Sequence, residues 1–259
     1  MKIHVITDLE GPAMITNFTQ TRDTTPESKA ISMALLTAEV NACVDGVLDF
    51  DPQAEVIVWD GHGSGGINLL DFHPQAKFLP HSHVPPRYGL DESYDAQFFV
   101  GQHAMAGTPN APLAHTYSSK TIEYHKINGV PHGEFGCRAI MVGQLGIPTV
   151  FLSGDDKAVA EAQALVPGLH GAIVKWGLGR ECALSLAPKA AQELIRVTAT
   201  RACADIGNIP PVIVPPPYEQ EIRVYEGVSI EGYLSRPNAE KLDERTVLIR
   251  AESIFELVV

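Results

Sequence analysis

Short apolar runs alternate along the chain with longer segments in which apolar residues recur every three or four positions. The short runs are rich in β-branched and aromatic residues and predict strands, whereas the longer spacing predicts amphipathic helices. The expected strands are residues 2–7, 55–59, 96–100 and 148–152. The expected helices are residues 26–47, 134–146, 157–166 and 185–204.

The ends of the predicted helices carry residues that favour helix starts. Thr25 and Pro26 suit the N-cap and the first helical position of one helix. Asp155 and Asp156 precede an alanine-rich segment and suit a second cap. Strands that alternate with capped helices imply βα units, so we expect a mostly parallel sheet covered by helices on both faces.

A proline-rich segment divides the chain. Residues 208–217 contain five prolines, and two further predicted strands follow at residues 221–225 and 246–250. Such a segment is typical of a domain boundary. We therefore expect an α/β fold with two parts: a three-layer domain over residues 1–207 and a small α+β domain over residues 208–259.

Composition and charge exclude several classes of protein. The chain has 259 residues with 45% hydrophobic and 19% charged residues, which is a globular composition. Its 31 acidic and 19 basic residues give a net charge of −12, so we expect no nucleic-acid partner. Four cysteines without a Cys-x-x-Cys pair predict neither a disulfide framework nor a thiolate metal site.

The sequence gives no sign of export or membrane insertion. Its first residues, MKIHVITDLEG, lack a basic leader followed by an apolar run. No stretch approaches the ~18 consecutive apolar residues of a membrane helix. We therefore expect a cytoplasmic protein that does not bind membranes.

Acidic residues and histidines directly follow the predicted strands. They are Asp8 and Glu10, Asp60 and His62, His103, and Asp155 with Asp156. The carboxyl ends of parallel strands share one edge of the sheet, where ligands bind. We therefore expect several of these side chains to meet there.

The residue types at this edge favour a metal site. In extended backbone, the spacing of Asp8 and Glu10 places both carboxylates on the same side. Two such neighbours are unfavourable unless a cation or a proton lies between them. Together with His62 and His103 they offer the oxygen and nitrogen ligands that suit zinc and related divalent ions. This set predicts a metal-dependent hydrolase.

Simpler interpretations exist for each residue alone. Asp8 and Glu10 could be solvated loop acids, His103 a hydrogen-bonded histidine, and Glu134 an acid favoured by a helix N-terminus. The glycine-rich residues 61–66 could cradle a phosphate, but they lack both the G-x-G-x-x-G order and the Walker lysine. No G-x-S-x-G elbow supports a serine hydrolase. The expected convergence at one sheet edge is what favours the metal site.

From its first residue to about residue 202 the chain resembles the D-aminopeptidases of peptidase family M55. The resemblance is carried by ordered short motifs: Thr7-Asp8-Leu9-Glu10-Gly11, Asp60-Gly61-His62, Gly101-Gln102-His103-Ala104, His115 and Gly133-Glu134-Phe135-Gly136. It implies two zinc ions per chain, with Mn²⁺ or Co²⁺ as substitutes. The implied ligands are Asp8 between both ions, Glu10 and His62 on one, and His103 and Glu134 on the other.

The resemblance also implies a reaction and an assembly. His115 matches the family's candidate catalytic histidine, and family members form ring-shaped decamers. We therefore expect a homo-oligomeric, zinc-dependent aminopeptidase that removes the N-terminal residue, including a D-amino acid, from short peptides by means of a metal-activated water. The preferred handedness depends on the shape of the pocket and cannot be read from the ligands.

Another two-metal hydrolase, an amidase or a phosphoesterase, is the alternative. A phosphoesterase should add Lys or Arg beside the metals to hold phosphate. Within the matched motifs only Lys120 and Arg138 could do so. We expect Arg138 to point away from the site on its helix, which disfavours this alternative.

Overall fold

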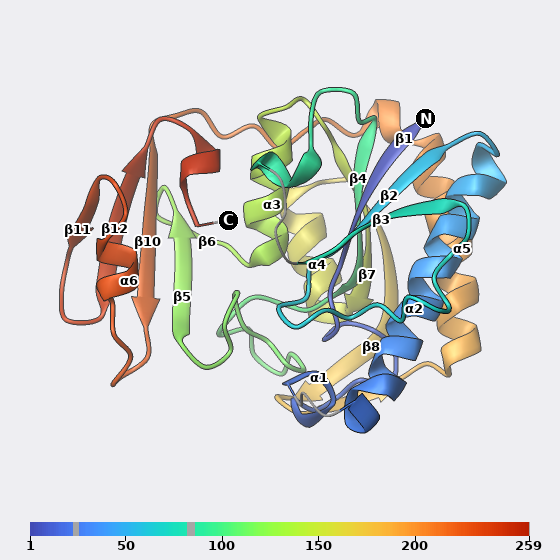
Figure 1. Ribbon diagram of the computed structural model, residues 1–259, viewed down its shortest axis with the longest axis horizontal. Helices are drawn as coiled ribbons and strands as arrows, with labels where there is room; N and C mark the ends of the chain where they lie inside the picture. Colours follow the sequence, from blue (N-terminus) through green and yellow to red (C-terminus); the bar gives the residue numbers. More distant parts are fainter. Residues whose placement is uncertain (23–25, 82–85, 259) are drawn as a thin grey trace.

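The computed structural model describes residues 1–22, 26–81 and 86–258 (Figure 1). Its larger sheet has seven strands in the order β3-β2-β1-β4-β7-β8-β9. All neighbours in this sheet are parallel except β8 and β9. The strands are β1 (Lys2–Thr7), β2 (Glu55–Asp60), β3 (Ala76–Leu79), β4 (Ala96–Gln102), β7 (Thr149–Asp155), β8 (His170–Gly179) and β9 (Cys182–Ser185).

Two pairs of helices cover this sheet and complete three layers (Figure 1). One face carries α2 (Pro26–Phe50) and α5 (Pro188–Ala204), and the other carries α3 (Glu134–Gly143) and α4 (Asp156–Leu165). α2 and α5 approach closely at Gly46, where a Cβ would lie 2.4 Å from the carbonyl oxygen of Arg196. The predicted α/β class with a mostly parallel sheet is confirmed.

The helix starts follow the predicted chemistry. The Asp155 side chain caps α4 by accepting hydrogen bonds from the backbone N–H groups of Lys157 and Ala158 at 2.9 and 3.1 Å. α2 begins at Pro26 as predicted, and α5 begins at Pro188. Thr25, the predicted cap of α2, lies outside the described residues. The short α1 (Thr19–Arg22) and α6 (Glu231–Leu234) complete the α-helices of the described residues.

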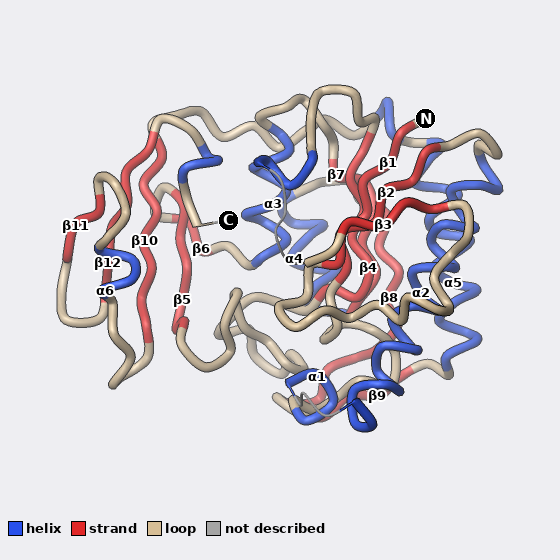
Figure 2. Tube along the Cα trace, in the orientation of Figure 1, coloured by secondary structure: helices blue, strands red, loops and turns tan. Residues whose placement is uncertain are grey.

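A second, antiparallel sheet has five strands in the order β11-β12-β10-β5-β6. Figure 2 shows it as a separate group of strands, with α3 between it and the larger sheet. Its strands are β5 (Ile122–Ile127), β6 (Val130–Pro131), β10 (Tyr218–Val224), β11 (Ala239–Lys241) and β12 (Thr246–Ala251). β5 and β6 come from the range 1–207, so this sheet takes strands from both sides of the boundary expected at residue 208.

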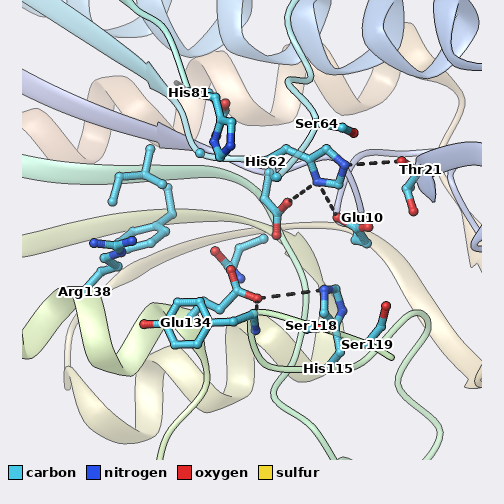
Figure 3. Close-up of a pocket in the computed structure, with 18 of the residues that line it drawn as sticks. Glu10, Thr21, His62, Ser64, His81, His115, Ser118, Ser119, Glu134 and Arg138 are labelled. Atoms are coloured by element: carbon cyan, nitrogen blue, oxygen red, sulfur yellow. Dashed lines mark hydrogen bonds and ion pairs between the residues drawn. The ribbon is translucent and has the colours of Figure 1, made fainter. Parts of the chain in front are cut away.

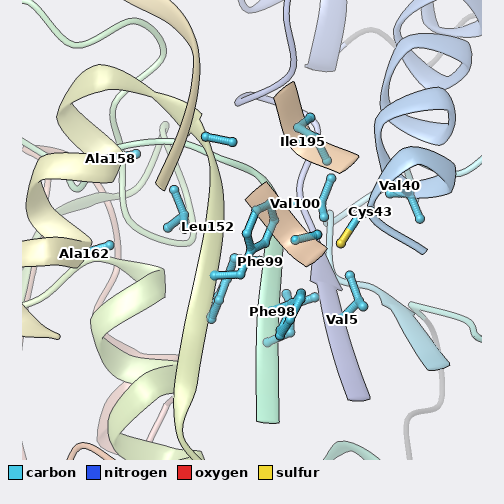
Figure 4. Close-up of a cluster of buried hydrophobic side chains, with 14 of the residues drawn as sticks. Val5, Val40, Cys43, Phe98, Phe99, Val100, Leu152, Ala158, Ala162 and Ile195 are labelled. Atoms are coloured by element: carbon cyan, nitrogen blue, oxygen red, sulfur yellow. The ribbon is translucent and has the colours of Figure 1, made fainter. Parts of the chain in front are cut away.

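Two hydrophobic clusters fill the interior. The larger lies around the parallel sheet, where Val5, Phe98 and Leu152 are fully buried (Figure 4). The smaller lies between α3 and the second sheet and includes Ile140 and Ile222. Each fully buried side chain of this size contributes about 1.5–3 kcal/mol to folding. α3 therefore packs into both clusters and fixes the position of one sheet against the other.

One helix of the described part of the chain is long and apolar enough to cross a membrane. It is the segment Lys29–Phe50 of α2, with a mean hydropathy of 1.4 over its most apolar window. This window is 56% buried against the rest of the protein, and α2 packs on α5 and β4. The core helix of a globular protein meets the same test, so length and composition here are weak support for a membrane span.

Candidate metal centre

Five loops or element ends bring the predicted site residues together at the carboxyl edge of the parallel sheet (Figure 3). β1 lies between β2 and β4, with Thr7 paired to Asp60 on one side and to Val100 on the other. The residues that follow these strands are therefore neighbours. The set comprises Asp8 and Glu10 after β1, His62 after β2, His103 after β4, His115 in the next loop and Glu134 at the start of α3.

Asp8 occupies the centre of the cluster. Its Oδ1 lies 3.1 Å from Nδ1 of His62, and its Oδ2 lies 3.0 Å from Nε2 of His103. The two oxygens of one carboxylate thus face two different histidines. This is the arrangement that a carboxylate shared between two cations requires.

A second carboxylate lies close to each of the two histidines, His62 and His103. Nδ1 of His62 lies 3.1 Å from Oε2 of Glu10, and Nε2 of His103 lies 3.4 Å from Oε1 of Glu134. Three groups of candidate ligands result: Asp8 with Glu10 and His62, Asp8 with His103 and Glu134, and Glu10 with His103 and His115. Within each group the ligand atoms all lie within 4.8 Å of one another. The structure therefore brings together all five residues that the sequence nominated as metal ligands.

The hydrogen bonds of the histidines fix which nitrogen faces the acids. Nε2 of His62 lies 3.3 Å from the carbonyl oxygen of Thr21, and Nδ1 of His103 lies 2.9 Å from that of Ala104. A carbonyl can only accept, so these nitrogens carry the hydrogen. When a bound cation replaces the proton on the opposite nitrogen, each ring is neutral and that nitrogen directs a lone pair towards the cation. Ligating histidines are usually held by this kind of outer hydrogen bond.

The residues fit a bound cation. Asp8 Oδ2, Glu10 Oε2 and His103 Nε2 are buried and have no hydrogen-bond partner among the described residues. Buried acceptors that face one another without a partner are costly unless a cation or proton lies between them. Burial alone would lower the pKa of His62, yet Glu10 and Asp8 raise it to about 10. The surplus of negative charge thus attracts positive charge to this point.

His115 lies beside the ligand cluster. Its ring stacks on that of His103, with centroids 3.9 Å apart and an angle of 13° between the planes. Its Nδ1 lies 2.8 Å from the carbonyl oxygen of Leu113 and therefore donates, which leaves Nε2 free to face the cluster, 3.9 Å from Oε1 of Glu134. Burial, and then the charge of His103, lower the pKa of His115. The ring is consequently neutral near pH 7 and able to accept a proton.

Buried polar side chains hold the loops that carry the candidate ligands. Asp60 accepts hydrogen bonds from the backbone N–H of Gly66 at 2.9 Å and of Ile67 at 3.4 Å, and so orients the loop that carries His62. On α4, Glu161 accepts from the N–H of Met105 at 2.9 Å. A Cβ on Gly133 would lie 2.8 Å from Cβ of Met105 and 3.2 Å from its Cα, so a glycine is favoured just before Glu134.

Lys175 is a buried residue that holds the backbone after β1 in place, and the sequence did not predict this role. Its ammonium group donates to the carbonyl oxygens of Glu10, Pro12 and Ile15 at 2.5, 3.1 and 2.5 Å. Burial lowers its pKa to about 8, partly opposed by Asp155. A single lysine in the apolar segment 172–178 is the only sequence signal. The side chain fixes the turn that begins at Glu10.

A cavity of about 570 Å³ opens onto the candidate ligands. Asp8, Glu10 and Glu134 line it, and Arg138 lines it too. The expectation that Arg138 points away from the site is therefore wrong. Arg138 follows Glu134 by four residues, which places both side chains on the same face of α3.

Comparison with known proteins agrees with this geometry. A sequence profile of peptidase family M55, described as D-aminopeptidase, matches residues 1–259. A D-aminopeptidase from Bacillus subtilis (strain 168) is 28% identical over 221 residues, which are 83% of this chain and 78% of that protein. The chain belongs to the M55 family of peptidases, a class of hydrolases.

A solved structure extends the similarity to the whole fold. The Zn-dependent D-aminopeptidase DppA from Bacillus subtilis, described as a self-compartmentalizing protease, matches with a TM-score of 0.91 and 26% sequence identity. The match covers 99% of this chain and 93% of that one. The second antiparallel sheet is thus included in the shared fold.

Proposed function

We propose that this protein is a zinc-dependent aminopeptidase that holds two zinc ions and removes the N-terminal residue of short peptides, including D-amino acids. The main support is the position of Asp8, whose two oxygens face His62 and His103 separately. Glu10 and His62 would complete the ligands of one ion, and His103 and Glu134 those of the other. The match to a Zn-dependent D-aminopeptidase supports both the metal and the substrate class.

The protein's own residues would bind and protonate the substrate. Bound zinc supplies Lewis acidity, which activates water and polarises the scissile carbonyl. The surplus of carboxylates attracts the ammonium group of a peptide N-terminus, which selects for chain ends. His115, whose Nε2 faces the cluster, would accept a proton from the attacking water and return it to the leaving amine. Burial of the acids excludes bulk water from the reacting groups.

We also propose that the protein forms a homo-oligomer in the cytoplasm, with the ring-shaped decamer as the specific expectation. The self-compartmentalizing relative and the near-complete coverage of its fold support this assembly. Light scattering on the purified protein tests it, and a monomer at micromolar concentration would contradict it. The division at residue 208 stays a prediction that limited proteolysis can address.

A phosphoesterase is a second candidate because Arg138 lines the cavity, where it could contact a phosphate. Membership in a peptidase family favours the aminopeptidase. The test compares nitroaniline release from D- and L-alanyl-p-nitroanilide with nitrophenol release from nitrophenyl phosphate. We expect release from the anilide only, and about two zinc ions per chain after dialysis. Less than one zinc per chain, with no activity restored by Zn²⁺, Mn²⁺ or Co²⁺, would contradict the proposal.

A further inference from the structure

Arg138 is a buried cation that lacks an acidic partner among the described residues. Arg138 is only 8% exposed, and within the described part of the chain its side chain makes one long hydrogen bond, 3.7 Å from Nη1 to Sδ of Met141. No carboxylate of residues 1–22, 26–81 or 86–258 forms an ion pair with it. A buried guanidinium without an anion is costly. A side chain of this kind that lines a cavity is therefore ready to bind an anion from solution.

Aromatic rings hold the guanidinium in place without using its N–H groups. Its Cζ lies 4.1 Å from the ring centroid of Tyr88 and 4.8 Å from that of Trp59. Contacts of this kind stabilise a desolvated cation. They engage the flat faces of the group, whereas its five N–H donors point outward around the edge. The edge of the guanidinium thus stays available for a planar anion.

Two further unpaired polar groups lie in the same part of the cavity wall. Nε1 of Trp59 and Nδ1 of His81 are buried and have no hydrogen-bond partner in the described part of the chain. Both residues line the cavity with Arg138. Figure 3 shows His81 and Arg138 on one side of the carboxylates and Thr21 on the other. The cavity is therefore acidic at the metal centre, and beside it lie the guanidinium of Arg138 and the unpaired indole N–H of Trp59.

We propose that Arg138 binds the C-terminal carboxylate of the peptide substrate. This inference rests on the proposed aminopeptidase function. The carboxylates of Asp8 and Glu10 would then face the amino end of the peptide and Arg138 its other end. A substrate that carries both charges is a short peptide with free termini.

The spacing along α3 limits the length of that peptide. Arg138 lies four residues beyond Glu134, which is about 6 Å along a helix. A peptide advances about 3.3–3.6 Å per residue. A carboxylate at Arg138 therefore belongs to a residue one or two positions after the bond that is cleaved at the metal centre. Dipeptides and tripeptides meet this condition, and longer peptides place their carboxylate too far away.

The experiment compares a dipeptide acid with its amide. Wild type and Arg138→Met are assayed with D-Ala-D-Ala, with D-Ala-D-Ala amide and with D-alanyl-p-nitroanilide. We expect wild type to prefer the acid over the amide in kcat/KM by about 10- to 100-fold, the range of a hydrogen-bonded charge pair. Arg138→Met should abolish that preference. Arg201→Met, the same substitution on the exposed side of α5, is the matched control and should keep it.

Arg22 is the other arginine against which the assignment of carboxylate binding to Arg138 is tested. It also lines the cavity, and its Nη2 is buried without a hydrogen-bond partner among the described residues. If Arg22→Met removes the preference for the acid and Arg138→Met does not, the inference is wrong. A wild type that cleaves acid and amide equally well also overturns it and leaves the aminopeptidase proposal intact. A wild type that cleaves none of the three substrates contradicts the proposed function instead.

Two further measurements guard against a folding defect. Arg138→Lys keeps the charge and most of the volume but loses the paired donors, so it should lower the preference for the acid if Arg138→Met does not fold. Binding of the product D-alanine, compared with D-alaninamide by calorimetry, reports recognition of the carboxylate without turnover. We expect D-alanine to bind more tightly than D-alaninamide, and only in proteins that retain Arg138. Equal binding of both compounds to wild type would overturn the inference.

Discussion

His103 and His115 stack face to face, with ring centroids 3.9 Å apart. Each ring is also fixed by a hydrogen bond to a backbone carbonyl, at Ala104 and at Leu113. The backbone N–H of His115 in turn donates to the carbonyl of Ala104 at 3.3 Å. A candidate ligand and a candidate proton carrier are thereby held at a fixed separation.

His115→Ala should separate proton transfer from metal binding. We expect the variant to keep its zinc and to lose kcat by about 10²–10⁴-fold, the usual contribution of a general base. Steady-state kinetics and metal analysis on the same sample measure both quantities. His170→Ala, which removes a histidine paired with Asp205 at 2.7 Å on a different edge of the sheet, is the control and should change neither. An unchanged kcat in His115→Ala would remove this residue from the mechanism.

Asp8→Ala should release both metal ions, because each oxygen of this carboxylate faces a different candidate ligand group. In the proposed arrangement Glu10 completes the ligands of one ion only, with His62, so Glu10→Ala should weaken the binding of that ion. Zinc content after dialysis, measured by atomic emission, distinguishes the two results. Full zinc content and full turnover in Asp8→Ala would contradict the bridging role.

Lys175→Met should destabilise the fold from within the core. The variant leaves the carbonyl groups of Glu10, Pro12 and Ile15 without their donor. A buried acceptor that is left unsatisfied costs on the order of 1–3 kcal/mol. Urea denaturation measures the loss, and zinc affinity should fall as well because the backbone at Glu10 is no longer held.

Lys157→Met is the matched control for this substitution. Lys157 is partly exposed, pairs with Asp156 at 2.6 Å and donates to the carbonyl oxygen of Gly177 at 2.9 Å. An exposed pair contributes about 1 kcal/mol or less. If the two lysine variants unfold at the same urea concentration, the supporting role of Lys175 is wrong.

Stability should fall as the pH drops from neutral. His4 is fully buried, and burial followed by the charge of Arg138 lowers its pKa to about 3. The unfolded chain titrates this group near its ordinary value of 6.5. Between these values the unfolded state binds a proton that the folded state does not, so the free energy of unfolding falls as the pH decreases.

His4→Asn isolates that contribution. The slope of unfolding free energy against pH between 4.5 and 6 should be smaller in the variant than in wild type, by at most about 1.4 kcal/mol per pH unit. Urea denaturation at several pH values gives both slopes, and the other titrating groups are common to the two proteins. Parallel slopes would show that His4 is protonated in the folded state.

The sequence predicted the elements with strong local signals. The four predicted strands of the parallel sheet correspond to β1, β2, β4 and β7, and the capping chemistry of Asp155 is confirmed. β8 was not among the predicted strands, because Gly171, Gly177 and Lys175 interrupt its apolar pattern. Lys175, which interrupts the apolar pattern of β8, is also the residue that donates a hydrogen bond to the carbonyl oxygen of Glu10.

The part of the site that could be predicted consists of residues that directly follow the carboxyl ends of strands. Asp8, His62 and His103 follow neighbouring strands, so the order of strands was enough to bring them together. The expected direction of Arg138 was wrong, because its spacing of four residues from Glu134 places both side chains on the same face of α3. Residues such as Glu161 hold the loops of the site through contacts between segments that are distant in the sequence. A single sequence carries no local signal of such contacts.

The pairing of β5 with β10 has a consequence for synthesis of the chain. β5 lies between the loop that carries His115 and the helix that begins at Glu134, and its partner strand starts only at Tyr218. A nascent chain on the ribosome thus contains all six candidate residues well before β10 emerges to anchor the segment that links His115 to Glu134. Translation would have to pass Tyr218 before the proposed peptidase could act on peptides around it.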